Sequence, residues 1–157
     1  MASVFKINNL ECAYSNGKTV LHIEDLEVPS GKLVFVLGVS GIGKSTLIET
    51  LGLMNNTIKN STSSEILFTS NEVTEDISDM WSKDNSYVSQ FRRKHFSFIF
   101  QNTNLMPNFT AGQNMAVRML LEGASLEDSK DKVMYFMDKL NLERELFERN
   151  IYELSGG

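Results

Sequence analysis

The stretch from Gly38 to Thr46, GVSGIGKST, constrains the fold of this chain more than any other. It matches the phosphate-binding loop pattern G-x-x-x-x-G-K-[ST], in which glycines let successive backbone N–H groups point into one concavity. The apolar run 33–37 precedes the loop with the composition of a strand, and residues 47–54 follow it with apolar side chains at helical spacing. We therefore predict a strand, a phosphate loop and a helix in succession, with a polyphosphate as the ligand.

The fixed positions of the loop have different expected tasks. Lys44 brings a point charge to the β- and γ-phosphates, and the hydroxyl of Ser45 is a ligand for the Mg²⁺ ion that shields them. The helix that begins at the loop adds the positive end of its dipole. The candidate nucleotide-binding residues of the loop are Gly38, Val39, Ser40, Gly41, Ile42, Gly43, Lys44, Ser45 and Thr46.

Composition limits the class of protein. Of the 157 residues, 41% are hydrophobic and 22% charged, the balance of a soluble globular domain. The formal net charge of −5 argues against a nucleic-acid binder held by general electrostatics. Cys12 is the one cysteine, so we expect no internal disulfide and a reducing, cytoplasmic setting. The sequence shows neither a secretory signal pattern nor a run of the roughly 20 apolar residues that a membrane helix needs.

Two β segments, 3–10 and 20–28, are expected before the loop. A turn at Ser15-Asn16-Gly17 joins them, since Asn-Gly is a strong turn signal. Tyr14 lies just before this turn. An aromatic ring there can stack on a purine base or simply pack against the hairpin, and the residues alone leave both readings open.

A polar excursion and a further strand are expected after the loop helix. Residues 55–84 are predicted to lie on the surface with a short strand at 65–68, since they begin with a run of mostly Asn, Thr and Ser. Residues 96–100 alternate aromatic side chains, which predicts a strand that ends at Gln101. Ligands of α/β sheets bind at the carboxyl ends of strands, so the Gln101 amide is a candidate contact for Mg²⁺ or an attacking water.

The last third of the chain predicts helices. Thr110 and Gln113 form a capping-box pattern, and Gly123 is placed to stop the helix that follows it. Ser125 is expected to cap a second helix with one apolar face. That face consists of Val133, Phe136, Met137 and Leu140. Methionines are frequent in this region, which favours a packed helical core over an adaptable docking surface.

Taken together, GVSGIGKST, a glutamine at a strand end and the closing LSGG resemble the ATP-binding-cassette (ABC) family of transporter ATPases. In the family's order, Tyr14 matches the aromatic residue that stacks on adenine, and Gly38 to Ser45 match the Walker A loop. Gln101 matches the Q-loop glutamine. The start of the signature motif is matched by Leu154, Ser155, Gly156 and Gly157. The stretch 91–115 is especially similar to the branch that powers lipoprotein release and macrolide export.

The resemblance implies an α/β fold: a partial P-loop core with an antiparallel β subdomain and a helical subdomain, the C-terminal part of the sheet being absent. Residues 1–101 then form the N-terminal part of the nucleotide-binding core, and residues 102–157 form the helical subdomain that ends in the signature. It also implies ATP and Mg²⁺ as cofactors, Lys44 and Gln101 as catalytic residues, and Ser45 and Gln101 as metal ligands.

The partners implied by the resemblance are a second ATPase subunit and an integral membrane permease. In the family two subunits pair head to tail, so the signature residues 154–157 close over ATP held by the Walker A loop of the other subunit. The apolar residues just after Gln101 are expected to face the permease. The implied location is cytoplasmic, peripheral on the inner face of the plasma membrane, and no nucleic-acid partner is expected.

The sequence stops before the Walker B aspartate, the catalytic glutamate and the switch histidine of the family. We therefore expect an N-terminal fragment that binds ATP weakly and hydrolyses it no faster than a Lys44→Ala control, because the general base is missing. Two alternatives remain. A nucleic-acid-associated ABC-type ATPase is disfavoured, because no sustained heptad pattern follows Gln101. A non-catalytic regulatory nucleotide-binding module is the other.

Overall fold

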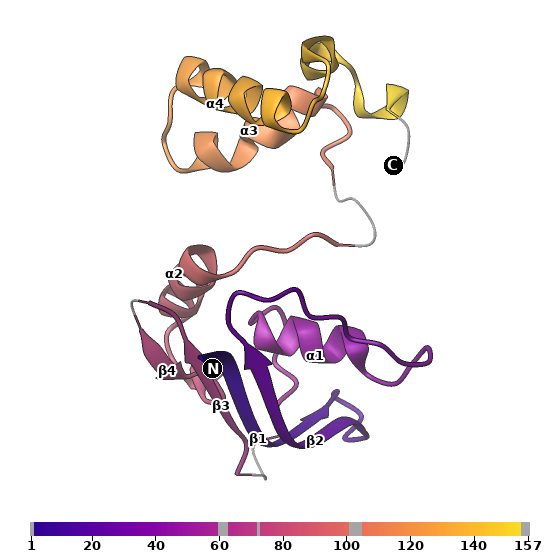
Figure 1. Ribbon diagram of the computed structural model, residues 1–157, viewed down its shortest axis with the longest axis vertical. Coiled ribbons are helices and arrows are strands. Elements are labelled where there is room, and N and C mark those ends of the chain that lie inside the picture. The colour runs from indigo at the N-terminus through magenta and orange to yellow at the C-terminus, as the bar shows by residue number, and fades with distance from the viewer. Residues whose placement is uncertain (1, 60–62, 72, 101–104, 155–157) are drawn as a thin grey trace. The chain divides into compact units, whose positions relative to one another are not determined.

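The computed structural model describes residues 2–59, 63–71, 73–100 and 105–154. The chain divides into two compact units, residues 1–98 and 99–157 (Figure 1). The predicted division at residue 101, into a nucleotide-binding core and a helical subdomain, stays a prediction, because residues 101–104 lie outside the described ranges.

An antiparallel hairpin begins the first unit. Strand β1 (Ser3–Ala13) pairs with β2 (Thr19–Pro29), which confirms the two predicted β segments. The N–H of Gly17 donates to the carbonyl oxygen of Tyr14 at 2.8 Å and closes the predicted turn. Gly17 has a φ of 74°, a left-handed conformation that glycine adopts without a steric penalty.

Two more strands complete a four-stranded antiparallel sheet. The strand β3 (Glu65–Thr69) pairs with β1, and β4 (Thr74–Asp76) pairs with β3, giving the order β2-β1-β3-β4 (Figure 1). The predicted strand at 65–68 is therefore confirmed. The prediction that the surrounding region is only a surface excursion is wrong, because Ile77 and Met80 are fully buried. Their apolar side chains pack beneath the sheet, and the polar composition of the surrounding segment gives no sign of this burial.

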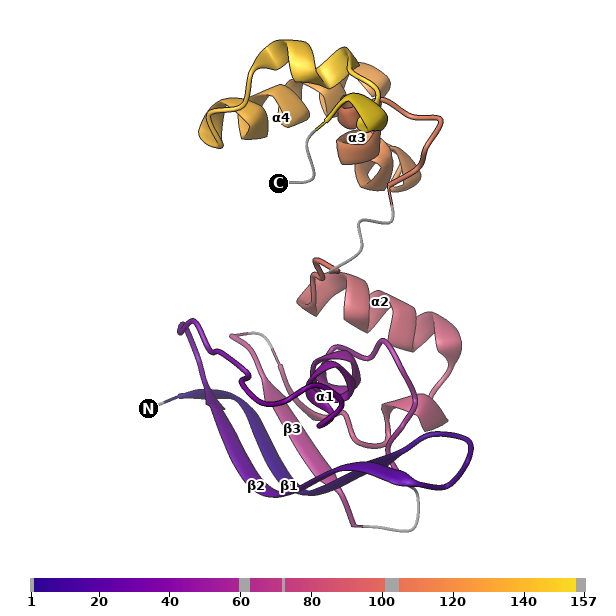
Figure 2. The same cartoon turned by 90° about the vertical axis from the view of Figure 1, so that its right-hand side faces the viewer.

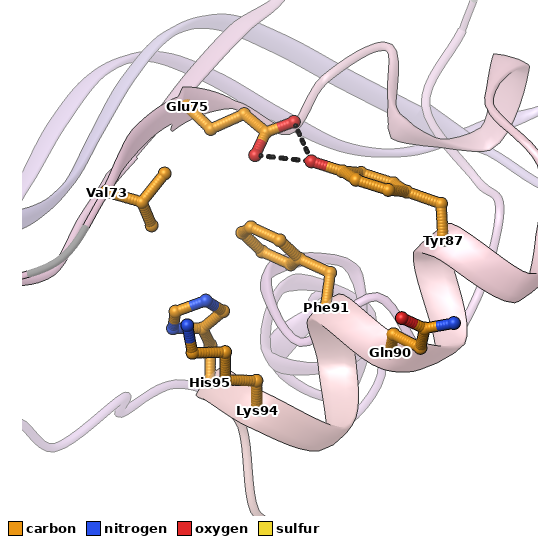
Figure 3. A pocket seen from close by; sticks show the side chains of 7 residues that line it. All are labelled: Val73, Glu75, Tyr87, Gln90, Phe91, Lys94 and His95. Atoms are coloured by element: carbon orange, nitrogen blue, oxygen red, sulfur yellow. Dashed lines mark hydrogen bonds between the residues drawn. The ribbon is translucent and has the colours of Figure 1, made fainter.

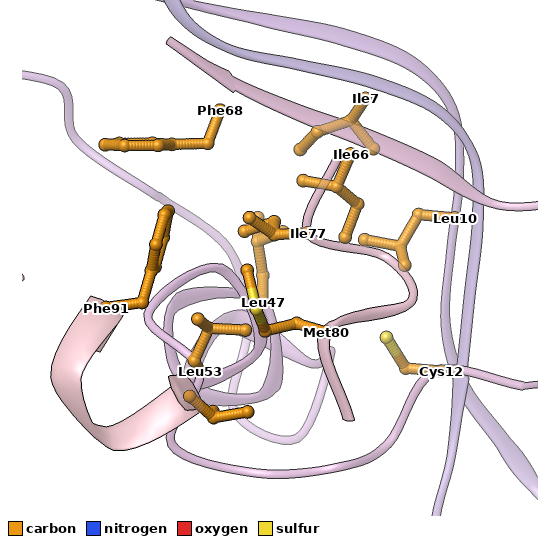
Figure 4. Close-up of a cluster of buried hydrophobic side chains, with 11 residues drawn as sticks. Ile7, Leu10, Cys12, Leu47, Leu53, Ile66, Phe68, Ile77, Met80 and Phe91 are labelled. Carbon is orange, nitrogen blue, oxygen red and sulfur yellow. The ribbon is translucent and has the colours of Figure 1, made fainter. Parts of the chain in front are cut away.

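One face of this sheet packs against the helices α1 (Lys44–Leu51) and α2 (Asn85–His95) (Figure 2). The short 3₁₀ helix η1 (Met80–Ser82) precedes α2 in the sequence. The shared core contains Ile7, Leu10, Cys12, Leu47, Leu53, Ile66, Phe68, Ile77, Met80, Val88 and Phe91 (Figure 4). Asn9 has a φ of 50°, which interrupts the strict alternation of β1 and lets both Ile7 and Leu10 face this core.

The strands predicted at 33–37 and 96–100 are not present. Neither segment pairs with another strand in the described chain, and all five side chains of 33–37 are exposed. Ile99 and Phe100 are exposed as well, whereas Phe96 packs against the core. Apolar composition indicates a segment suited to burial between strands, but a strand forms only where a neighbour supplies the ladder of hydrogen bonds.

The second unit is built from the helices α3 (Ala111–Leu121) and α4 (Leu126–Lys139), which pack against each other (Figure 1). Two short 3₁₀ helices follow, η2 (Arg144–Glu148) and η3 (Ile151–Glu153). Both predicted helix starts are confirmed. Thr110 and Gln113 form a capping box, and the Ser125 hydroxyl accepts a 3.0 Å hydrogen bond from the N–H of Asp128.

The core of the helical unit consists of Ala116, Val133, Met137 and Phe147. The predicted apolar stripe of α4 is only half right, because Phe136 and Leu140 are 50% and 68% exposed. Since α3 and η2 are the elements that pack on α4, they cover Val133 and Met137 and leave the far side of the stripe bare. Within the described ranges, no helix combines the length and the apolar character needed to cross a bilayer.

Glu11 of β1 ties the hairpin to the segment that follows α1. Its carboxylate accepts hydrogen bonds from the Lys59 ammonium at 2.8 Å and from the Thr19 hydroxyl at 2.5 Å. These donors stabilise the charged carboxylate, so they lower the pKa of Glu11, with Lys59 the larger cause. The pair therefore stabilises the fold above the ordinary glutamate pKa, about 4.3, and this contribution is lost as the pH falls through the lowered folded-state value.

Glu11→Gln is expected to lower the melting temperature at pH 7 and to weaken the fall of the melting temperature as the pH drops below the ordinary glutamate pKa, about 4.3. Thermal denaturation followed by circular dichroism at a series of pH values measures both. Glu24→Gln, an exposed position on the same hairpin, is the matched control and should preserve the pH profile. If the melting temperature of Glu11→Gln falls with pH in parallel to that of the unmodified chain, the stabilising role assigned to the Glu11 carboxylate is contradicted.

Candidate functional site

The glycine loop leads directly into the N-terminus of α1. Gly41 and Gly43 have φ values of 81° and 99°, and Gly43 is the N-cap residue of the helix. Among the residues that the structure describes, no side chain caps this end, and the first turn contains no acidic residue. The first backbone N–H groups of α1 are therefore not occupied by a capping side chain, and with the helix dipole they form a site suited to an anion.

Gly43 is required by its surroundings as well as by its backbone conformation. A Cβ atom at this position would lie 2.8 Å from the carbonyl oxygen of Val20 and 3.4 Å from Cβ of Leu21. The end of the loop thus rests directly on the backbone of β2. A side chain at this position would force the loop away from the hairpin. The close packing of the loop on β2 therefore requires glycine at position 43.

Lys44 folds back over the loop that precedes it. Its ammonium donates 2.8 Å hydrogen bonds to the carbonyl oxygens of Gly38 and Val39. An ammonium has three N–H donors, so it can hold these two carbonyls and still donate to a phosphate oxygen. Next along the helix, Ser45 is exposed, whereas Thr46 is 5% exposed. Ser45 is therefore on the surface beside the loop, where its hydroxyl is a candidate metal ligand.

Tyr14 lies against the first turn of the same helix. Its hydroxyl oxygen is 3.1 Å from Oγ1 of Thr46, within hydrogen-bonding distance, while 47% of the residue stays exposed. The backbone of this region is held as well, since the N–H of Ala13 donates to the carbonyl oxygen of Thr57 at 2.8 Å. The structure thus brings together the aromatic residue and the glycine loop that the sequence singled out.

Most of the other predicted site residues cannot be placed with this loop. Gln101, Ser155, Gly156 and Gly157 lie outside the described residues. Leu154 is described: it follows η3 and its N–H donates to the carbonyl oxygen of Ile151 at 3.3 Å. Within the described part of the first unit, the candidate site therefore consists of Tyr14 and residues 38–46.

Asn114 is a residue with an evident structural task that the sequence did not reveal. Its side-chain oxygen accepts from the N–H of Met106 at 2.7 Å, and its amide nitrogen donates to the carbonyl oxygens of Met106 and Thr110 at 3.2 and 3.0 Å. Asparagine is unfavourable inside a helix unless it bonds to nearby backbone, which is the signal that was available. Asn114 thus holds an exposed apolar loop that includes Leu105 and Phe109 against α3.

A cavity of about 370 Å³ lies elsewhere, between β4 and α2 (Figure 3). Its lining residues are Val73, Glu75, Tyr87, Gln90, Phe91, Lys94 and His95. The carboxylate of Glu75 accepts from the Tyr87 hydroxyl, 3.0 Å from each of its oxygens, and from the Lys83 ammonium. The carboxylate raises the pKa of both partners. None of residues 38–46 lines this cavity, and the Glu75 carboxylate that lines it is already hydrogen-bonded within the protein. We therefore assign the cavity no part in the candidate site.

Comparison with known proteins identifies relatives along almost the whole chain. Residues 21–157 match the protein family described as ABC transporter. The lipoprotein-releasing system ATP-binding protein LolD of Zymomonas mobilis is 29% identical over 158 residues, covering 99% of this chain and 63% of its own length. The macrolide export ATP-binding/permease protein MacB 1 of Yersinia pestis is 27% identical over 161 residues, covering all of this chain and 23% of its own length.

The fold is that of solved ABC cassettes. A dimeric structure of MJ0796, a bacterial ABC transporter cassette, matches with a TM-score of 0.75 at 24% identity, covering 97% of this chain and 63% of that one. The same cassette in a post-hydrolysis state bound to ADP and Pi matches with a TM-score of 0.74. The predicted fold class is confirmed as a partial cassette, and the chain spans about 63% of the length of its LolD relative. The chain belongs to the ABC transporter family.

Proposed function

We propose that this chain is the ATP-binding part of an ABC transporter ATPase, which couples ATP binding and hydrolysis to substrate export or lipoprotein release. One observation carries the proposal: Tyr14 contacts the first turn of α1, the same turn that lacks a side-chain cap and from which the ammonium of Lys44 reaches back to the loop. An aromatic ring beside a phosphate loop supplies the two kinds of contact that a nucleotide triphosphate needs. The names of the LolD and MacB relatives support this reading.

In this proposal, different residues of the site bind different parts of the nucleotide. The adenine base stacks on Tyr14, and the phosphates lie among the backbone N–H groups of residues 38–46. Lys44 donates to the β- and γ-phosphates and is a catalytic candidate. Ser45, which is exposed, and Gln101 would hold Mg²⁺, whose charge would neutralise that of the phosphates. Gln101 also acts as a catalytic residue in this proposal, near the attacking water.

The proposed partners are a second ATPase subunit and an integral membrane permease. The second subunit contributes the signature residues 154–157 across a head-to-tail dimer, and the dimeric form of the MJ0796 cassette supports the pairing of two subunits. The permease contacts the exposed apolar loop that Asn114 holds against α3. The chain would then work on the cytoplasmic face of the membrane, attached through the permease.

The test is Mg²⁺-ATP binding measured by titration calorimetry on the folded chain. The unmodified chain is expected to bind, and Lys44→Ala is expected to weaken binding by about 10- to 100-fold, the cost of losing charge-assisted hydrogen bonds to phosphate. Lys132→Ala removes the same charge from an exposed position on α4 and should leave the affinity unchanged. No binding by the folded unmodified chain, or equal binding by the Lys44→Ala variant, refutes the proposal.

A further inference from the structure

The hydrogen bond between Tyr14 and Thr46 joins the two halves of the proposed nucleotide site. Tyr14 follows directly after β1, and Thr46, the last residue of the phosphate loop, lies in the first turn of α1. Their hydroxyl oxygens are 3.1 Å apart although 32 residues separate them in the sequence. The contact links Tyr14, which is proposed to stack on the base, to the helix α1, whose N-terminus is proposed to bind the phosphates.

The backbone around Tyr14 is fixed independently of this contact. The N–H of Ala13 donates to the carbonyl oxygen of Thr57, and the carbonyl oxygen of Tyr14 accepts from the N–H of Gly17, both at 2.8 Å. The remaining freedom of Tyr14 is therefore rotation of its side chain. A half-exposed ring rotates among rotamers unless its far end is held, and the hydroxyl is at that far end.

The other end of the contact is equally constrained. Thr46 is 5% exposed, so its side chain is held by its surroundings. The loop glycine Gly43 rests on the hairpin at the carbonyl oxygen of Val20. The hairpin and the start of α1 thus touch at two places, and the hydroxyl contact determines where the ring lies relative to the loop.

We propose that the hydroxyl of Tyr14 is a positioning group: in the unbound protein it already holds the ring in the orientation in which the ring stacks on the base. This inference rests on the proposed ATP site. A ring that is already ordered loses no side-chain entropy on binding, so the hydroxyl increases the affinity for a base-bearing ligand without touching it. The effect is confined to ligands with a base, because the phosphate loop does not depend on the orientation of the ring.

The test compares ATP with inorganic triphosphate, both with Mg²⁺, by calorimetry on the full chain. Tyr14→Phe keeps the ring and removes the hydroxyl, and it is expected to reduce the ratio of ATP affinity to triphosphate affinity by about three- to tenfold. Tyr14→Ala reduces the ratio further, because it also removes the stacking surface. Tyr87→Phe is the matched control: Tyr87 is 43% exposed and its hydroxyl is hydrogen-bonded to Glu75, and the ratio should stay unchanged.

Substitutions of Thr46 test the other partner. Thr46→Ser keeps the hydroxyl and should keep most of the ratio, whereas Thr46→Val should lower it and should show no additional loss when combined with Tyr14→Phe. A Tyr14→Phe ratio equal to or above that of the unmodified chain overturns the inference. Additive losses for Thr46→Val and Tyr14→Phe also overturn it. Absence of ATP binding by the folded unmodified chain instead refutes the proposed function itself.

Discussion

Replacing Gly112 with alanine is expected to destabilise the helical unit by about 1–3 kcal/mol, the usual cost of overpacking a core. An added Cβ would lie 2.2 Å from Cδ2 of Phe147, which real Cβ atoms essentially never do. The ring of Phe147 is 6% exposed and belongs to the core with Val133 and Met137, so it cannot move aside without displacing them. In an open helix the same substitution would stabilise by about 0.5–1 kcal/mol, so the sign of the effect is diagnostic.

Hydrogen exchange followed by mass spectrometry measures this effect locally, through amide protection in α3 and α4. The sheet of the first unit serves as the internal reference, and its protection should stay unchanged. Phe147→Leu combined with Gly112→Ala relieves the clash, so the double variant should lose less protection than the sum of the two single variants. Increased protection of α3 in Gly112→Ala would contradict the packing described for this unit.

Features determined by neighbouring residues were predictable from the sequence. The hairpin followed from its Asn-Gly turn, the first helix from the glycine loop, and the capped starts of α3 and α4 from Thr110 and Ser125. Each of these signals acts over a few residues, through backbone hydrogen bonds or positive φ angles. Such signals give the same result wherever the segment lies in the fold.

Features that depend on distant residues were not predictable in the same way. The segments 33–37 and 96–100 have strand composition, yet pairing requires a neighbour that local sequence does not specify. Ile77 and Met80 lie in an acidic stretch, and only the sheet above them makes them core residues. Phe136 has the spacing of a core residue in α4, but the part of the unit that the structure describes packs on the other side of that stripe.

The candidate site shows the same division. The sequence pattern named the loop residues and Tyr14 individually, because glycines, lysine and an aromatic side chain have recognisable chemistry. It did not reveal that Tyr14 bonds to Thr46 or that Gly43 rests on Val20, since both contacts depend on how the hairpin folds over α1. The relation between these residues, rather than their identity, is what the structure adds.

Gly43→Ala is expected to weaken Mg²⁺-ATP binding by about 30-fold or more while the first unit remains folded. Gly43 has a φ of 99°, which costs other residues roughly 1–2 kcal/mol, and its Cβ would lie 2.8 Å from the carbonyl oxygen of Val20. Since neither β2 nor the start of α1 can shift without breaking sheet or helix hydrogen bonds, the loop itself must change shape. The backbone N–H groups that are proposed to bind phosphate then no longer converge.

Gly31→Ala separates this local effect from backbone strain in general. Gly31 also has a positive φ, 67°, but nothing lies within 4 Å of the position that its Cβ would take. It should therefore lower the melting temperature modestly and keep ATP affinity, whereas Gly43→Ala should lose affinity for ATP and for inorganic triphosphate alike, because the shared phosphate contacts are lost. Calorimetry with both ligands decides the matter: unchanged triphosphate binding by folded Gly43→Ala would mean that the loop does not hold the phosphates, since its shape could then change without affecting them.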